Sequence, residues 1–249
     1  MCARLRKLNK DYGVTITKAQ VEELYNRQHG RCAGCQKAVQ LIGKRGSPST
    51  ACVDHDHVTG VIRGLLCRAC NLALGNLYDN RQTMRRLMAY MDMDHSKVNL
   101  YLIGSLRNPT VPQVANKLRE HGYDVFDEWH AAGPAADDEW QKYCTNRGFT
   151  YKDALAGRTA QNTFTFDRAY LDLADAAVMV LPAGKSAHLE LGYVRGSGKP
   201  AFILLNGEVD RYEVMPNVAS AVCYDMGELL FQLQDTFTEH QGTEPSAFG

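Results

Sequence analysis

Residues 52–71 read CVDHDHVTGVIRGLLCRACN, and a shorter motif, RCAGCQ, precedes them at residues 31–36. Each segment contains a Cys-x2-Cys pair. Four thiolates at this spacing are typical of a structural zinc site, in which the ion replaces the hydrophobic core that a short segment cannot build. The predicted zinc ligands are Cys32, Cys35, Cys67 and Cys70. The sequence therefore predicts a small domain organised around one zinc ion.

A cluster of carboxylates and imidazoles lies between the cysteine pairs. Asp54 offers a hard oxygen ligand for Mg²⁺ or Mn²⁺, and Asn71 offers an amide oxygen from the start of the next helix. His55 follows Asp54 on a strand, so its side chain points to the opposite face and is the candidate general base. Asp56 and His57 are each a candidate second ligand, phosphate contact or structural pair. This chemistry suits metal-assisted cleavage of a phosphodiester.

The net charge of the chain is zero, but the charge is unevenly distributed. Residues 1–97 hold 16 Lys and Arg against 8 Asp and Glu, and the remainder carries the opposite excess. A basic segment joined to an acidic one suggests two tasks, and the basic part suits nucleic acid. The alternative is an unevenly charged, solvated surface.

The chain contains no apolar run near the roughly 20 residues that span a bilayer, and no secretory signal. We therefore expect no membrane association and a cytoplasmic location, in the host cell if a phage encodes the chain. The cysteines outside the zinc motif are expected to be reduced thiols. They are Cys2, Cys52, Cys144 and Cys223.

Two domains are predicted, at residues 1–93 and 98–249. The first is a small zinc-bound α+β domain of the ββα-metal kind, after a basic arm at residues 1–13. Its predicted helices lie at residues 15–28, 67–75 and 81–91, its strands begin near residues 51 and 61, and Thr17 is an expected N-cap.

In the second domain, strands alternate with helices, which predicts an α/β fold with a doubly wound parallel sheet of the Rossmann or flavodoxin-like kind. The expected strands are residues 98–104, 123–126, 176–181, 201–205 and 218–224. The expected helices are residues 111–121, 164–174, 186–196 and 226–240. Residues 127–160 are predicted to be an irregular insertion, a lid or an oligomer contact, with one helix near residues 137–146. Ligands are expected at the turns after Ile103 and Leu181.

Three segments of the second domain carry candidate chemistry. Gly104-Ser-Leu-Arg107 follows the first strand and suits a phosphate or another polar ligand. Glu190 lies in the first turns of a helix, whose amino end is expected to favour the ionised form. Asp167 supplies a second carboxylate. Two carboxylates can cleave a glycosidic bond, one as nucleophile and one assisting the leaving group.

The Asp-His-Asp-His run, the Arg-Gly-Leu-Leu-Cys segment and the Asn after the last cysteine resemble the recombination endonuclease VII branch of the HNH nucleases, over residues 15–92. The resemblance implies that Asp54 and Asn71 hold the catalytic metal and that His55 is the general base. It implies auxiliary or DNA-contacting roles for His57 and Arg63. The family often has a histidine two residues before the first Asp, where this chain has Cys52.

Glu190-Leu-Gly-Tyr193, with Asp167, resembles the nucleoside 2-deoxyribosyltransferase superfamily over residues 98–205. The resemblance implies that Glu190 is the nucleophile. The implied substrate contacts are Tyr101, Gly104, Ser105, Arg107, Ser186 and His188. Transferases commonly carry another Asp six residues before the Glu, where this chain has Gly184, and this favours a nucleotide N-glycosidase.

The predicted function is a bifunctional enzyme that joins an Mg²⁺-dependent DNA endonuclease to a deoxynucleoside or deoxynucleotide N-glycosidase. The expected partners are DNA and a small deoxynucleoside or deoxynucleotide, and family likeness implies homo-oligomers. Two alternatives remain open. In one, the first domain only anchors the protein on DNA. In the other, the second domain cleaves NAD or a nucleotide signal.

Overall fold

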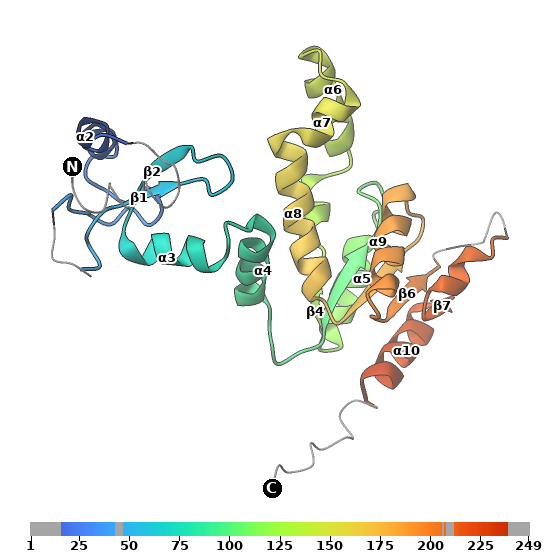
Figure 1. Cartoon of the computed structure of the whole chain (residues 1–249). Coiled ribbons are helices and arrows are strands. Elements are labelled where there is room, and N and C mark those ends of the chain that lie inside the picture. Colours follow the sequence, from blue (N-terminus) through green and yellow to red (C-terminus); the bar gives the residue numbers. More distant parts are fainter. Residues whose placement is uncertain (1–15, 43–46, 206, 208–211, 239–249) are drawn as a thin grey trace, which may run out of the picture. The chain divides into compact units, whose positions relative to one another are not determined.

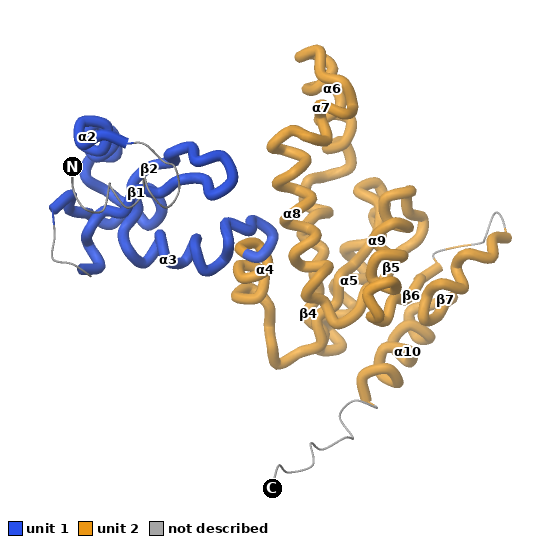
Figure 2. The backbone as a smooth tube through the Cα atoms, in the orientation of Figure 1, with its two compact units in different colours: residues 1–83 blue, residues 84–249 orange. Residues whose placement is uncertain are grey.

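The computed structural model describes residues 16–42, 47–205, 207 and 212–238 (Figure 1). The predicted basic arm and the residues after 238 lie outside this range. The chain divides into two compact units, unit 1 at residues 1–83 and unit 2 at residues 84–249 (Figure 2). The division falls within helix α4 (Arg81–Asp92), before the predicted boundary at residues 93–98.

Unit 1 is built from two antiparallel strands and flanking helices. Helix α2 (Lys18–Arg27) begins at the predicted N-cap Thr17, which forms a capping box with Gln20. Strand β1 (Cys52–His55) pairs with β2 (Ile62–Leu66), and α3 (Arg68–Asn76) follows. The register shifts after Asp54, because Asp54 faces Gly64 while His55 faces Ile62. Arg63 is therefore the extra residue of a bulge, a device that re-aims a side chain.

The core of unit 1 is small, and a polar side chain helps to hold it together. The buried cluster is Cys32, Val39, Leu66 and Cys67. Gln28 accepts a hydrogen bond from the Leu65 amide (2.8 Å) and donates to the Leu65 carbonyl (2.9 Å). These bonds fix the end of α2 against β2. So little apolar surface does not stabilise a fold alone, which is the physical reason for a zinc ion.

Unit 2 contains a five-stranded parallel sheet in the order β4-β3-β5-β6-β7. The strands are β3 (Asn99–Ile103), β4 (Asp124–Phe126), β5 (Ala176–Val180), β6 (Ala201–Leu204) and β7 (Ala221–Cys223). In chain order within the unit this is 2-1-3-4-5, the flavodoxin-like order. The predicted doubly wound fold is confirmed. The strand order reverses between β3 and β5, so the carboxyl ends of these two strands define the expected ligand site.

Helices cover both faces of the sheet. They are α5 (Val111–Glu120), α8 (Arg158–Leu173), α9 (Lys185–Gly196) and α10 (Met226–Thr238). Residues alternate between faces along each strand. Leu100 and Leu102 therefore join a core with α5 and α10, while Tyr101 and Ile103 join a core with α8 and α9. Both cores are apolar, which explains the continuous apolar strand patterns in the sequence.

The insertion is more regular than predicted. It forms a 3-10 turn, η1 (Glu128–Ala132), and helices α6 (Ala136–Asn146) and α7 (Tyr151–Ala156), and α8 already begins at Arg158. Figure 1 shows α6 and α7 gathered at the amino end of α8. The helix predicted near residues 137–146 corresponds to α6. The prediction of an irregular segment was wrong for α7 and the start of α8, because these parts are largely exposed and lack a clear apolar period. A Thr150–Asp153 capping box starts α7.

A second 3-10 turn, η2 (Met215–Val218), precedes β7 and was not predicted. Among the helices that the structure describes, none has the length and apolar character to cross a membrane.

Candidate functional sites

The four predicted cysteines of unit 1 converge. Their sulfur atoms all lie within 4.8 Å of one another, and the Cys35 and Cys67 sulfurs are 3.7 Å apart. A tetrahedral zinc ion with Zn–S bonds of about 2.3 Å places its sulfur ligands about 3.8 Å apart. Within the described part of the chain, no other group of three or more His, Cys, Asp or Glu converges in this way. The residues therefore fit a structural zinc ion.

Local structure prepares this cysteine site. Cys67 is the N-cap of α3, and its sulfur accepts a hydrogen bond from the Cys70 amide (3.5 Å). A Cβ on Gly34 would lie 3.3 Å from the Cys70 sulfur, so a side chain at this position would crowd that ligand. Burial raises the pKa of Cys32, but backbone hydrogen bonds at Cys67, Cys35 and Gly34 outweigh it and lower the pKa to about 6. A thiolate is the form that binds zinc.

The predicted nuclease cluster is organised by Arg63. Its guanidinium donates to both oxygens of Asp54, at 2.8 and 3.0 Å, and to both oxygens of Asp79, at 3.1 Å each. His57 lies on the other side of Asp79, with Nδ1 3.2 Å from a carboxylate oxygen. The side chains of Asp54, Arg63, Asp79 and His57 thus form one connected network. Arg63, predicted only as an auxiliary residue, lies at its centre.

His55 has the properties of a neutral base. It is buried, and its ring lies edge-on to that of His57, with centroids 4.9 Å apart. Burial lowers the pKa of His55, and the positive charge of protonated His57 lowers it further. A neutral imidazole at pH 7 can accept a proton. Asp56 has a structural role, because its carboxylate accepts from the Val58 and Thr59 amides and closes the turn between the strands.

Asp54, one of the two predicted magnesium ligands, is engaged by Arg63. Both oxygens of Asp54 accept hydrogen bonds from Arg63. Asn71 lies on α3, which packs against β1 and β2. Each Asp54 oxygen keeps a further lone pair beside its bond to Arg63, so binding of a divalent ion by Asp54 and Asn71 stays a prediction.

The second candidate site lies where the sheet order of unit 2 reverses. The loop after β3 is tied to the loop after β5 by Asn108, a buried side chain that donates to the carbonyls of Val180 and Pro182, each at 3.3 Å. A Cβ on Gly104 would lie 2.8 Å from Val111 and 3.3 Å from Trp129. The predicted phosphate loop therefore requires glycine at its first position for reasons of packing.

Glu190, Asp167 and Tyr101 lie close together in this unit. Burial raises the pKa of Glu190 to about 7, and the negative charge of Asp167 contributes to that shift. Burial likewise raises the pKa of Asp167 to about 6. Burial also raises the pKa of Tyr101 well above its usual value, with added effects of the Glu190 and Asp167 charges. Two carboxyl groups with raised pKa values beside a buried tyrosine are a candidate reaction centre.

The expectation that the helix would favour ionised Glu190 was wrong. Glu190 is the sixth residue of α9, and the dipole effect fades beyond the first turn. Loss of water around the carboxylate therefore dominates, and the protonated form is favoured instead.

The other predicted contacts lie on exposed or half-buried positions around the site. His188 is exposed, and its Nδ1 lies 2.8 Å from the Gly184 carbonyl, while Ser186 is exposed on the first turn of α9. Arg107 donates to Asp138 of α6 at 2.9 Å. Ser105 accepts a hydrogen bond from the Arg107 amide at 3.2 Å.

Residues from the insertion complete the loop after β3 and were not predicted. The Trp129 indole donates to the Leu102 carbonyl at 2.8 Å, and the His130 Nε2 lies 3.1 Å from the Asn108 carbonyl. Asp79 of unit 1 was also missed. In the sequence, Trp129, His130 and Asp79 are marked only by their residue types. No local pattern points to their partners, which lie far away in the sequence.

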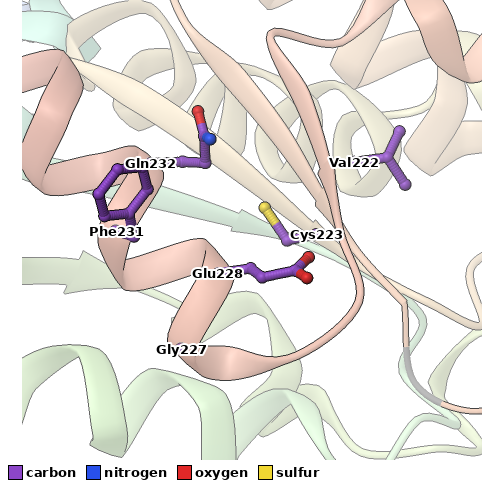
Figure 3. Close-up of a pocket in the computed structure, with 6 residues that line it drawn as sticks. All are labelled: Val222, Cys223, Gly227, Glu228, Phe231 and Gln232. Atoms are coloured by element: carbon purple, nitrogen blue, oxygen red, sulfur yellow. The ribbon is translucent and has the colours of Figure 1, made fainter.

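A cavity of ≈ 340 Å³ lies elsewhere in unit 2, between β7 and the start of α10 (Figure 3). Glu228, which lines it, accepts a hydrogen bond from the Tyr224 amide at 2.8 Å and so closes the turn into α10. Figure 3 shows Cys223 close to Glu228, and burial raises the pKa of this thiol to about 11. A protonated thiol and a turn-forming carboxylate do not make a reaction centre, so we do not assign the site here.

Comparison with known proteins gives a match for the N-terminal part of the chain. Residues 5–93 match the recombination endonuclease VII family, which confirms the predicted resemblance there. The Gene 59 protein of Mycobacterium phage L5 is 39% identical over 77 residues, and that of Mycobacterium phage D29 is 43% identical over 77 residues. Each alignment covers 30% of this chain and 43% of the relative. The chain thus spans less than half the length of these relatives.

Among solved structures, the chain is similar to the CMP N-glycosidase BcmB of Clostridium botulinum. The similarity covers 55% of this chain and 98% of BcmB, with 13% sequence identity and a TM-score of 0.34.

Proposed function

We propose that this chain joins a DNA endonuclease, at residues 1–93, to an enzyme that cleaves the N-glycosidic bond of deoxynucleosides or deoxynucleoside 5′-monophosphates, at residues 98–249. The observation that carries the second activity is the half-buried pair of Glu190 and Asp167, with raised pKa values, beside the buried Tyr101. The pair belongs to helices that pack on the strands at the sheet's switch point. Cleavage of a glycosidic bond by two carboxyl groups uses an acid whose pKa is raised by its surroundings, as burial does at this pair.

The proposed reaction has two steps. In the first, the Glu190 carboxylate bonds to C1′ of the sugar while the C1′–N bond breaks, and Asp167 gives its proton to the departing base. In the second, water bonds to C1′, its proton returns to Asp167, and Glu190 leaves as a carboxylate. The pair shares one proton between about pH 6 and pH 7. Because the pKa of Glu190 is the higher of the two, this proton lies mostly on Glu190, and the reaction uses the minor form in which Asp167 holds it.

The loop after β3 supports a substrate that carries a phosphate. Arg107 is half-exposed and pairs with Asp138, a partner that an incoming phosphate can replace. Ser186 is exposed at the start of α9, where helix amides favour anions. Gly184 stands where transferases commonly carry an Asp. These features favour hydrolysis of a nucleotide over base exchange between nucleosides.

A panel of substrates tests the second activity. We expect the full chain to release free base from at least one deoxynucleoside or deoxynucleoside 5′-monophosphate, measured by liquid chromatography at pH 6.5. Consumption of NAD alone contradicts the substrate class and supports the alternative of a NAD-cleaving effector. Formation of a new nucleoside when a second base is added identifies a transferase.

For the first unit, support comes from the family match and from His55, whose lowered pKa keeps it neutral at pH 7. The proposed role of His55 is to take a proton from the attacking water. His57 and Arg63 are proposed to contact the phosphate backbone, since both are partly exposed and positively charged when protonated. Zinc is proposed to hold the frame.

We expect the full chain with added Mg²⁺ or Mn²⁺ to cleave supercoiled or branched DNA, and His55→Ala to cleave it at least about 100-fold more slowly, because a general base contributes roughly that much. His29→Asn is the matched control, because His29 is an exposed histidine of the same unit with a φ of 52°, which asparagine tolerates. Gel electrophoresis of nicked and linear DNA measures the rates. Binding of DNA without cleavage by the unaltered chain contradicts the nuclease and supports the anchoring role.

A shared purpose is part of the proposal. The nuclease would degrade or nick DNA, and the glycosidase would process the released deoxynucleotides, in the cytoplasm of an infected cell. Homo-oligomers are proposed for both halves from the family resemblances.

A further inference from the structure

The carboxylate of Asp172 is the centre of a second network on the helices that carry Glu190 and Asp167. One oxygen accepts from Arg168 Nε (2.7 Å) and from the Tyr193 hydroxyl (2.6 Å), and the other accepts from Arg86 Nε (2.8 Å). The Asp172 side chain is only 7% exposed. A carboxylate buried to this extent with several charged donors makes strong, directional contacts. These bonds restrict the relative movement of the helices that supply the donors, α4, α8 and α9.

The network joins α8 to α9 close to the reaction centre. Tyr193 follows Glu190 by three residues on α9, and Asp172 follows Asp167 by five on α8, so the network lies about one helical turn from the carboxylate pair. Arg168 reinforces the joint, because it also donates to the Tyr193 hydroxyl at 2.6 Å and lies 3.9 Å from the centre of the tyrosine ring. Sliding of one helix along the other breaks these bonds.

Helix α4 contributes two further contacts to α8. Its Arg86 bonds Asp172, and its Asp92 accepts a hydrogen bond from the Tyr170 hydroxyl at 2.8 Å. Both contacts bind α8. Arg86 lies before residue 98, inside the segment that matches the endonuclease family, yet it belongs to unit 2. The stretch at residues 98–249 therefore lacks one of the groups that fix its own helix α8.

We propose that Asp172, Tyr193 and Arg86 are positioning residues for cleavage of the N-glycosidic bond, which hold α8 and α9 in the register that sets Glu190 against Asp167. The proposal rests on the proposed function of that pair. This role requires no contact between these three residues and the substrate. They act by fixing the distance between the carboxyl groups and by keeping water away from them. Tyr193, the last residue of the Glu-Leu-Gly-Tyr motif, thereby gains a specific role.

The test compares Tyr193→Phe and Arg86→Met with the unaltered chain, all at full length. Tyr193→Phe keeps the ring beneath Arg168 and removes only the hydroxyl, so folding is preserved. We expect kcat for base release to fall roughly tenfold in each variant, as for loss of a hydrogen bond to a charged group, and KM to stay within about twofold. Arg85→Met is the matched control, because Arg85 forms no ion pair with another described residue, and it should retain the original kcat.

The second readout does not depend on activity. Titration of ¹³C-labelled glutamate by NMR should show the pKa of Glu190 falling by roughly one unit in Tyr193→Phe, because a looser joint admits water and separates the charges. Unchanged kcat together with an unchanged Glu190 titration overturns the positioning role. An unaltered chain that releases no base overturns the proposed function instead, and the titration still decides the positioning role.

Discussion

Replacing Glu190 by glutamine is expected to stabilise unit 2 at pH 8 and to leave its stability unchanged at pH 4. The pKa of Glu190 rises from an ordinary 4.5 to about 7 on folding, because the buried carboxylate loses water. Below pH 4.5 the group is protonated in both the folded and unfolded chain. Between pH 4.5 and pH 7 the unfolded chain ionises first, so the free energy of unfolding decreases as the pH rises through this range. Glutamine cannot ionise and avoids this loss.

The expected gain at pH 8 is at most about 3 kcal/mol, from a shift of about 2.5 pH units at 1.36 kcal/mol each. For a domain of this size, that corresponds to a rise in melting temperature of at most roughly 10 °C, measurable by calorimetry. Glu120→Gln is the control, because Glu120 is an exposed carboxylate at the end of α5. It should change neither the free energy of unfolding nor the melting temperature. An equal shift at pH 4 and pH 8, or none at pH 8, contradicts a Glu190 carboxyl group whose pKa is raised by loss of water on folding.

The second large effect is expected at the zinc site. Cys67→Ser should abolish binding of one zinc ion per chain and unfold unit 1, while unit 2 stays folded. Structural zinc contributes about 10–16 kcal/mol in small domains, which exceeds or equals the total stability of such a domain. The small buried cluster of unit 1 does not replace that contribution.

Tryptophan fluorescence reports on the folding of unit 2 alone. Both tryptophans of the sequence, Trp129 and Trp140, belong to unit 2. Tryptophan fluorescence should therefore remain native in Cys67→Ser while metal content falls and protease cleavage within unit 1 increases. Cys52→Ser, a buried cysteine of the same unit outside the four-thiolate cluster, should retain its zinc. Retention of zinc by Cys67→Ser, or loss of both units together, contradicts this account.

Much of the fold follows from local sequence patterns. Paired Cys-x2-Cys motifs predict the zinc site because a thiolate cluster needs only short turns and a helix start, as at Cys67. The apolar run at residues 98–103 predicts a parallel strand because both of its faces are buried. Within the insertion only the helix at α6 was predicted, and α7 and the first turns of α8 were missed, since these exposed segments have little apolar pattern to recognise.

The site was only partly accessible to sequence reasoning. Glu190 and Asp167 stood out by their motif, but the sign of the Glu190 pKa shift depends on burial, which helix position alone does not reveal. Asp79 joins the Arg63 network from a backbone with a φ of 54°, and no local pattern links it to residue 54. Nothing in the sequence distinguishes Asp172 from other carboxylates, because Arg86 and Tyr193 become its hydrogen-bond donors only in the folded chain. Long-range contacts of this kind carry no signal in one sequence.

The central claim is that Glu190 is the nucleophile that cleaves an N-glycosidic bond in unit 2. The most direct test is the rate of free-base release from a deoxynucleoside 5′-monophosphate, measured side by side for the unaltered chain and Glu190→Gln at pH 6.5. The account predicts release by the unaltered chain and a rate at least about 1,000-fold lower for Glu190→Gln, the scale expected when a nucleophile is lost. Equal rates for the two proteins would contradict it.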